Sequence, residues 1–247
     1  MIIADQYSHA DGESYISENY PSVLAELKMV IGLINAESCR LKVPKGNEKN
    51  KAKRAGVEKF YSPIHLNALF DYFFFQKGWD IKPRIKTHDS KREGFREMDA
   101  MKDKVGVEIQ FGKYAFLTYD IVAKMVIFKN YRIIDCGVEI CPMQSMLLEL
   151  SSGIGAFEQV SWDLRHREVA NIDIPVLVLG IAPDPKPFAI AEHRPEDEDS
   201  KSRPSRKHGD SLPEIVLHRY KKLSKNTLKA VQETGIDISA EDPRSLF

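Results

Sequence analysis

The segment at residues 99–110 (DAMKDKVGVEIQ) holds the side chains best suited to chemistry. Its second half alternates apolar and other residues, which predicts a strand that carries Glu108 and Gln110 on one face. Asp99 lies upstream, and a turn before the strand would bring its carboxylate beside that of Glu108. With the backbone carbonyl of Ile109, the two carboxylates would form an all-oxygen site suited to Mg²⁺, an ion that activates water and stabilises charge on a phosphate.

Two alternatives stay open for this segment. From the alternation alone, an ordinary amphipathic strand whose Glu108 and Gln110 face solvent is the more common arrangement. Asp103 also competes with Asp99 for the place of the second carboxylate. Because Asp103 sits at the start of the strand, it has less freedom to fold back than Asp99.

The elements that must position these residues follow from hydrophobic periodicity. Helical and extended patterns alternate through the first 183 residues, so we predict an α/β domain built on a central mixed sheet flanked by helices. The expected helices span 21–34, 62–78, 114–128 and 143–150, and the expected strands span 104–111, 132–141 and 174–182.

Composition restricts the class of protein. Of 247 residues, 43% are hydrophobic, which suits one large domain with or without a tail. The 36 basic and 36 acidic residues cancel, so overall charge indicates neither a nucleic-acid nor a membrane partner. No apolar run is long enough for a bilayer span, and we expect no signal peptide. Three cysteines without metal-ligand spacing favour the reducing cytoplasm.

Charge and proline content divide the rest of the chain. Residues 40–59 carry eight basic and two acidic side chains and few apolar ones, which predicts a solvated loop. We expect a domain over residues 1–183, a Pro- and charge-rich linker over 184–213, and a C-terminal helical extension over 214–247 whose amphipathic pattern begins at Glu214.

The segment also resembles a known family. A carboxylate followed some ten residues later by Glu-x-Lys on a strand is the signature of PD-(D/E)xK nucleases, and Gln in place of Lys is typical of the BglII/BstYI group of type II restriction endonucleases. The similarity continues in order along residues 1–183. It includes Tyr7-Ser-His-Ala10, Val107-Glu-Ile-Gln-Phe-Gly-Lys-Tyr114, Gly137-Val-Glu-Ile140, Ser151-Ser-Gly-Ile154 and Leu179-Gly-Ile-Ala-Pro183.

The resemblance implies a restriction-endonuclease-like core and a Mg²⁺-dependent cleavage of double-stranded DNA. Asp99, Glu108 and the Ile109 carbonyl correspond to the metal ligands, and Gln110 would orient the attacking water. Met98 replaces the proline that usually precedes the first Asp. Members of the group act as homodimers on palindromes that share a central GATC, and the helix over 114–128 resembles the one they use for dimerisation.

Several residues are candidates for DNA contact. Lys113 opens the helix after the catalytic strand, where a cation can reach a guanine edge, and Ser152 lies in a Ser-Ser-Gly turn able to approach a groove. Either residue is also compatible with a purely structural place on the surface. The basic segment would contact phosphates, with further contacts from Lys82, Arg84 and Lys86. Its candidates are Lys49, Lys51, Lys53 and Arg54.

The sequence therefore predicts a type II restriction endonuclease that needs no nucleotide cofactor, since no Gly-rich phosphate loop is found. Two alternatives share the fold. One is a repair or recombination nuclease acting on branched or damaged DNA, and the other is a non-catalytic DNA-binding protein.

Overall fold

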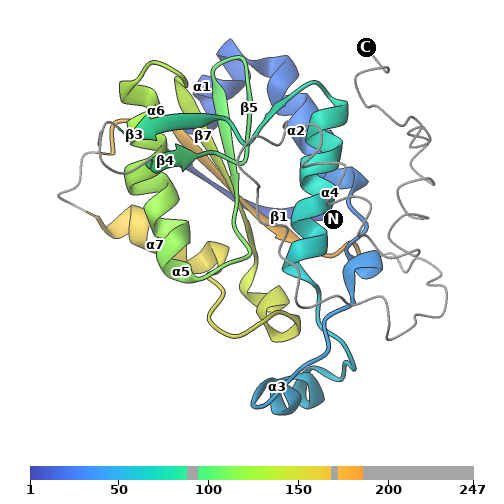
Figure 1. Ribbon diagram of the computed structural model, residues 1–247. Helices are drawn as coiled ribbons and strands as arrows, with labels where there is room; N and C mark the ends of the chain where they lie inside the picture. Colours follow the sequence, from blue (N-terminus) through green and yellow to red (C-terminus); the bar gives the residue numbers. More distant parts are fainter. Residues whose placement is uncertain (88–93, 168–171, 186–247) are drawn as a thin grey trace.

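A mixed six-stranded sheet forms the centre of the computed structural model, which describes residues 1–87, 94–167 and 172–185 (Figure 1). The strand order is β1-β8-β7-β6-β5-β2, in which β6, β7 and β8 run parallel and the remaining pairs are antiparallel. The strands are β1 (Ile2–His9), β2 (Asp80–Ile81), β5 (Ala100–Lys102), β6 (Val105–Ile109), β7 (Cys136–Pro142) and β8 (Val176–Ala182). A separate antiparallel hairpin is formed by β3 (Arg84–Thr87) and β4 (Gly94–Glu97).

Helices cover both faces of the sheet (Figure 1). Side chains of successive strand residues point to opposite faces, and in β6 and β7 both sets are therefore buried. One face packs with α1 (Gly12–Asn19), α2 (Pro21–Leu33), η1 (Ala36–Cys39) and α4 (Pro63–Gln76). The other packs with α5 (Tyr114–Tyr119), the π-helix η2 (Asp120–Met125), α6 (Val126–Asn130) and α7 (Phe157–His166). Val107 and Ile109 belong to the first core, and this leaves Glu108 on the side of η2.

The predicted fold class is confirmed, and so is most of the expected element order. The helix expected over 62–78 begins with Ser62 at the N-cap and Pro63 in the first turn, as its sequence indicates. The strand expected over 132–141 starts only at Cys136. The segment over 143–150 forms the short 3-10 helix η3 (Gln144–Glu149).

The solvated loop expected over residues 40–59 was wrong in part, because α3 (Glu48–Ala55) occupies its middle. Lys, Glu, Ala and Arg are good helix formers even without an apolar face. Ala52 is buried, and Gly56 ends the helix in the left-handed conformation. None of the helices within the described ranges is long and apolar enough to cross a bilayer. The linker expected over 184–213, from residue 186 on, and the extension expected over 214–247 lie outside the described residues.

Candidate functional site

Strand register brings the two predicted carboxylates together. In the antiparallel pair of β5 and β6, Ala100 faces Val107, so Asp99 lies across from Glu108 one residue further along. Asp103 lies in the turn at the other end of this pair and is exposed to solvent. The structure therefore places Asp99 beside Glu108, and Asp103 away from it.

Asp99 is held by contacts on both of its carboxylate oxygens. Lys82 Nζ donates to Oδ1, and the backbone N–H of Ile109 donates to Oδ2 at 2.8 Å. Burial alone would raise the pKa of this carboxyl, but the Lys82 charge and the two hydrogen bonds hold it below its usual value. Asp99 therefore stays ionised at the edge of β6.

Lys82 itself corrects one expectation. It was expected to add a phosphate contact to those of the basic segment, but its side chain is buried between Asp99 and Asp71, with Nζ 3.4 Å from Asp71 Oδ1. The residue has a left-handed backbone with φ of 57°, a conformation that is costly for lysine and is concentrated at functional sites. Lys82 is thus part of the carboxylate cluster.

Glu108 is the most deeply placed member of the expected site. Its Oε2 accepts from Lys124 Nζ at 2.9 Å, and Oε1 is buried without a hydrogen-bond partner. Burial and the neighbouring charge of Asp99 raise the pKa of Glu108 well above its ordinary value, while Lys124 opposes the shift. The Glu108 carboxylate is therefore short of positive charge.

Gln110 bridges the end of β6 to helix η2. Its Oε1 accepts from the backbone N–H of Gly112 at 2.7 Å, and its Nε2 donates to Asp120 Oδ2 at 3.0 Å. Asp120 in turn contacts Lys124 Nζ at 2.5 Å. The amide is thus the first link in a chain of contacts that ends at Glu108.

A further buried carboxyl lies next to Glu108 and was not expected from the motif. The tetrapeptide Gly-Val-Glu-Ile occurs at 106–109 and again at 137–140, and the parallel register pairs Glu108 with Glu139. Both carboxyl oxygens of Glu139 are buried without a hydrogen-bond partner. Burial, then the charges of Asp120 and Glu108, raise its pKa well above the usual value. The repeated tetrapeptide was the sequence signal for this pair.

The composition of the cluster fits a hard divalent cation. Carboxyl groups outnumber the ammonium groups of Lys82 and Lys124, and Glu108 leaves an oxygen unpartnered. Within the described ranges, no three His, Cys, Asp or Glu side chains are arranged to chelate an ion together. Asp99 and Glu108 would therefore need a main-chain oxygen to complete a protein ligand set. The Ile109 N–H already points to Asp99.

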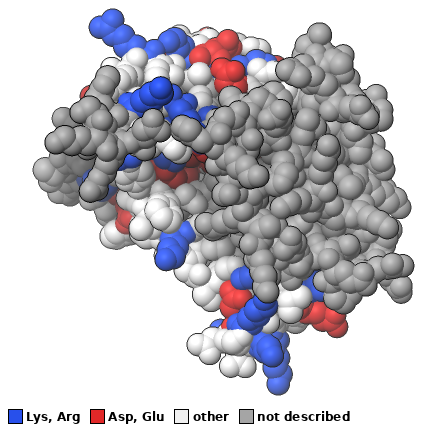
Figure 2. All heavy atoms as spheres, viewed as in Figure 1, with Lys and Arg blue, Asp and Glu red and all other residues white. Residues whose placement is uncertain are grey.

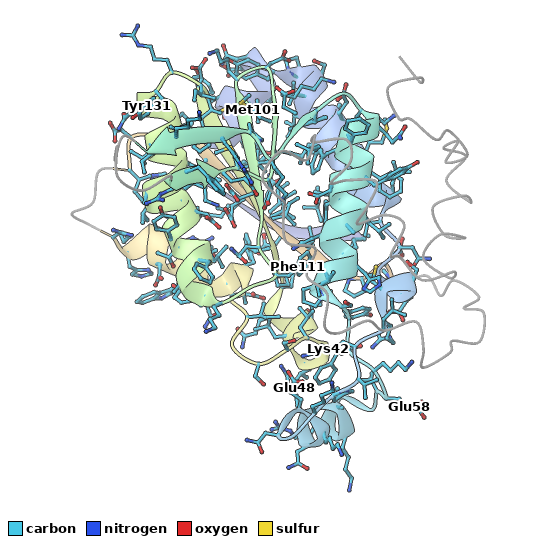
Figure 3. All side chains as sticks on the ribbon, viewed as in Figure 1. Lys42, Glu48, Glu58, Met101, Phe111 and Tyr131 are labelled. Atoms are coloured by element: carbon cyan, nitrogen blue, oxygen red, sulfur yellow. The ribbon has the colours of Figure 1, made fainter. Side chains whose placement is uncertain are left out.

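Predicted DNA-contact residues from three separate segments meet at one end of the molecule. Lys113 is bridged to Ile154, which places it beside the turn that carries Ser152. Lys42 connects the same turn to α3. Its Nζ lies 2.9 Å from Oε1 of Glu48, the first residue of α3, and contacts Oγ of Ser151 in the turn (Figure 3). Basic side chains project from this end (Figure 2).

The exposure of these residues separates two groups. Lys113, Ser152, Lys49, Lys53 and Arg54 are exposed. Lys51, by contrast, is only partly exposed and donates to the backbone oxygen of Leu150 at 2.7 Å. We therefore assign Lys51 a structural contact between α3 and η3, and the exposed residues remain candidates for DNA contact.

Comparisons with known proteins bear on the family and the fold. The sequence model of the restriction endonuclease BglII/BglIII family matches residues 4–181, which is most of the chain. The chain belongs to the BglII restriction endonuclease family. As a member, it is a type II restriction endonuclease, an enzyme that cuts DNA. No curated protein matches it in sequence.

Solved structures of the family share its fold. The crystal structure of BglII complexed with a DNA 16-mer matches with a TM-score of 0.57 and 17% identity, covering 73% of this chain and 78% of that one. The structure of free BglII matches with a TM-score of 0.50 and 18% identity, covering 73% and 79%. At this identity the matches establish the fold of the core.

Proposed function

We propose that the protein is a Mg²⁺-dependent endonuclease that hydrolyses both strands of duplex DNA at a short palindrome with a GATC core. The observation that carries this proposal is the pairing of Asp99 with Glu108 at the end of β6, in a chain of the BglII family. The metal and the site sequence follow from the resemblance of residues 1–183 to the BglII/BstYI group.

Asp99, Glu108 and the Ile109 carbonyl would hold the ion. Since the N–H and C=O of a strand residue point the same way, the Ile109 N–H bond to Asp99 directs the carbonyl to the same side. A divalent ion bound there would lower the pKa of a water molecule and stabilise negative charge on the phosphate. The Glu108 carboxylate, whose Oε1 has no hydrogen-bond partner, would accept the charge of such an ion.

Gln110 would act on the attacking water through the second hydrogen of its amide. One N–H of this group bonds to Asp120, and an amide nitrogen has two to donate. Because its oxygen is tied to Gly112, the amide is fixed in orientation. Its part in the reaction is thus to place a water molecule, without adding charge.

The end of the molecule that carries α3 and the Ser152 turn would contact the duplex. Lys113 and Ser152 are proposed to read bases, whereas Lys49, Lys53 and Arg54 would bind phosphates. Two copies of the chain, related by a two-fold axis, would match the symmetry of a palindrome and cut one strand each. The three cysteines are free and buried, which suits the reducing cytoplasm that we propose as its compartment.

The experiment that tests this function uses one plasmid prepared with and without adenine methylation at GATC. The purified protein is incubated with each preparation in Mg²⁺, and the fragment ends are sequenced. We expect discrete fragments with a common GATC-centred terminus, whose outer bases give the full site. Cleavage of a four-way junction but of neither plasmid would instead indicate a branched-DNA nuclease, and binding without any cleavage a non-catalytic protein.

A further inference from the structure

The strand that carries Glu108 supplies no cation to the proposed cleavage site. Hydrolysis of a phosphodiester increases the negative charge on the phosphate, and catalytic sites place fixed positive groups where that charge develops. Gln110, on the strand that carries Glu108, is neutral. The carboxyl groups around Gln110 add negative charge. A cation that balances this negative charge must therefore come from another element of the cluster.

Lys124 is the lysine that contacts Glu108. Its Nζ lies 2.9 Å from Glu108 Oε2 and 2.5 Å from Asp120 Oδ1. The Lys124 side chain is 15% exposed, against 3% for each of these carboxylates, so it is the most solvent-accessible of the three. Burial would lower the pKa of Lys124, but the two carboxylates raise it above the ordinary lysine value, and the group stays charged.

The local structure holds Lys124 in this position. Helix η2 is a π-helix, a rare winding that is frequent at functional sites, and it places Asp120 and Lys124 on the side of β6. Gln110 anchors Asp120 at 3.0 Å, and Asp120 pairs with Lys124. The neutral amide of the strand thus positions a cation that comes from the helix.

We propose that Lys124 is the catalytic cation of this endonuclease, an inference that rests on the proposed function. In the reaction, the oxygen of one water molecule bonds to phosphorus while the bond from phosphorus to one sugar oxygen breaks. The proton lost by water balances the one gained by the departing oxygen, which gives one phosphate end and one hydroxyl end. The Lys124 ammonium stabilises the charge on the phosphate during this transfer.

A simpler role for Lys124 is that of a counter-ion that only keeps Glu108 and Asp120 stable. The two roles differ in what rescues a loss of the charge. A counter-ion must contact both Glu108 and Asp120, as Lys124 does, whereas a catalytic cation can be supplied from another position that faces the same phosphate. Residue 110 is such a position, because its side chain already reaches Asp120 beside Lys124.

The test compares Lys124→Gln, which keeps a hydrogen-bond donor and removes the charge, with Lys124→Arg, which keeps the charge. A double variant, Lys124→Gln with Gln110→Lys, returns a cation from the strand. Lys129→Gln, the same change on α6, is the matched control, and Glu108→Ala marks the inactive enzyme. Each variant is assayed for its single-turnover cleavage rate at saturating enzyme on a duplex that carries the mapped site. Binding to the same duplex without Mg²⁺ and thermal unfolding are measured in parallel.

We expect Lys124→Gln to cleave roughly 100-fold more slowly with unchanged binding, as when one charge-stabilising donor is removed. Lys124→Arg should keep most of the rate, and the double variant should regain about tenfold or more. If Lys124→Gln cleaves like the wild type, or the double variant folds and regains nothing, the inference is wrong. If Lys124→Gln does not fold, the cleavage rate of the folded double variant is compared with that of Glu108→Ala. A rate no higher than that of Glu108→Ala overturns the inference. If the wild type cleaves no DNA, the proposed function fails as well.

Discussion

Two regions of the molecule use lysines in opposite ways. At the end of β6, Lys82 and Lys124 are drawn inward and contact the carboxylates of Asp99 and Glu108. At the end formed by α3 and the Ser152 turn, most basic side chains are exposed to solvent. Charge held in a low-dielectric cluster acts on a reacting group at short range, while exposed charge contributes salt-dependent affinity. Cleavage and binding should therefore be separable by mutation.

The largest effect is expected from Glu108→Ala. Removing this carboxylate takes away a proposed metal ligand, so we expect the cleavage rate to fall by roughly a thousandfold or more while binding to the duplex persists. Single-turnover cleavage and fluorescence anisotropy measure the two quantities.

Asp103→Asn is the matched control for Glu108→Ala. Asp103 lies in the exposed turn between β5 and β6 with a φ of 52°, a conformation that asparagine tolerates. This control should cleave like the wild type. Normal cleavage by Glu108→Ala, or an equal loss in both variants, would contradict the assignment of the site.

An intermediate effect is expected when the exposed basic residues of α3 are removed together. In the triple variant Lys49→Ala, Lys53→Ala, Arg54→Ala, loss of three phosphate contacts should lower the slope of log affinity against log salt by about 3 per protomer. The cleavage rate at saturating enzyme should stay unchanged. A titration of affinity between low and physiological salt gives the slope.

Lys51→Ala separates the contacts within this helix. Because Lys51 Nζ donates to the Leu150 oxygen, its loss should lower thermal stability with little change in the salt slope. An unaltered salt slope in the triple variant would show that α3 does not contact phosphate. The exposed basic residues of α3 would then have no part in DNA affinity.

The smallest effect concerns stability. The folded-state pKa of Glu139 is raised, so its carboxyl stabilises the fold while protonated and costs stability as pH rises above the ordinary carboxyl pKa of about 4.3. Glu139→Gln keeps the shape and removes this cost. We expect it to melt a few degrees higher at pH 8, since about 1 kcal/mol corresponds to roughly 2–4 °C in a chain of this size. The difference should vanish near pH 4.

Thermal melts followed by circular dichroism across this pH range measure the effect of Glu139→Gln. Glu58→Gln, at an exposed position, should not change the melting temperature (Figure 3). If Glu139→Gln instead lowers the melting temperature at pH 8, the carboxylate has a stabilising partner that the cluster described above does not explain.

What the sequence could predict depended on local patterns. The alternation through β6, the Ser62-Pro63 start of α4 and the apolar run of β8 each determine one element from nearby residues. Helix α3 was missed because its residues form a helix by propensity and contact, without an apolar periodicity. Its buried face is limited to Ala52.

The candidate site was predictable only in part for a similar reason. Glu108 and Gln110 follow from the strand pattern, and Asp99 from a turn whose register is set by β5. Lys82 and Lys124 come from other elements, and their approach to the carboxylates depends on tertiary packing. A motif confined to one strand carries no information on which helix residue completes it. The repeated Gly-Val-Glu-Ile, by contrast, is visible in the sequence and could have indicated Glu139, which was not predicted.

The π-helix has a consequence for how this enzyme can vary. A π-turn holds more residues than an α-turn, so deletion of a single codon within residues 120–125 would restore regular α-helical winding. The wider turn accommodates its extra residue locally, so α5 and α6 on either side would keep their orientation and only the side chains within the turn would shift. Deletion of a residue between Asp120 and Lys124 would change their spacing and shift Lys124 relative to Glu108, while α5, α6 and β6 keep their places. We therefore expect the length of this segment to be less tolerant of change than its composition.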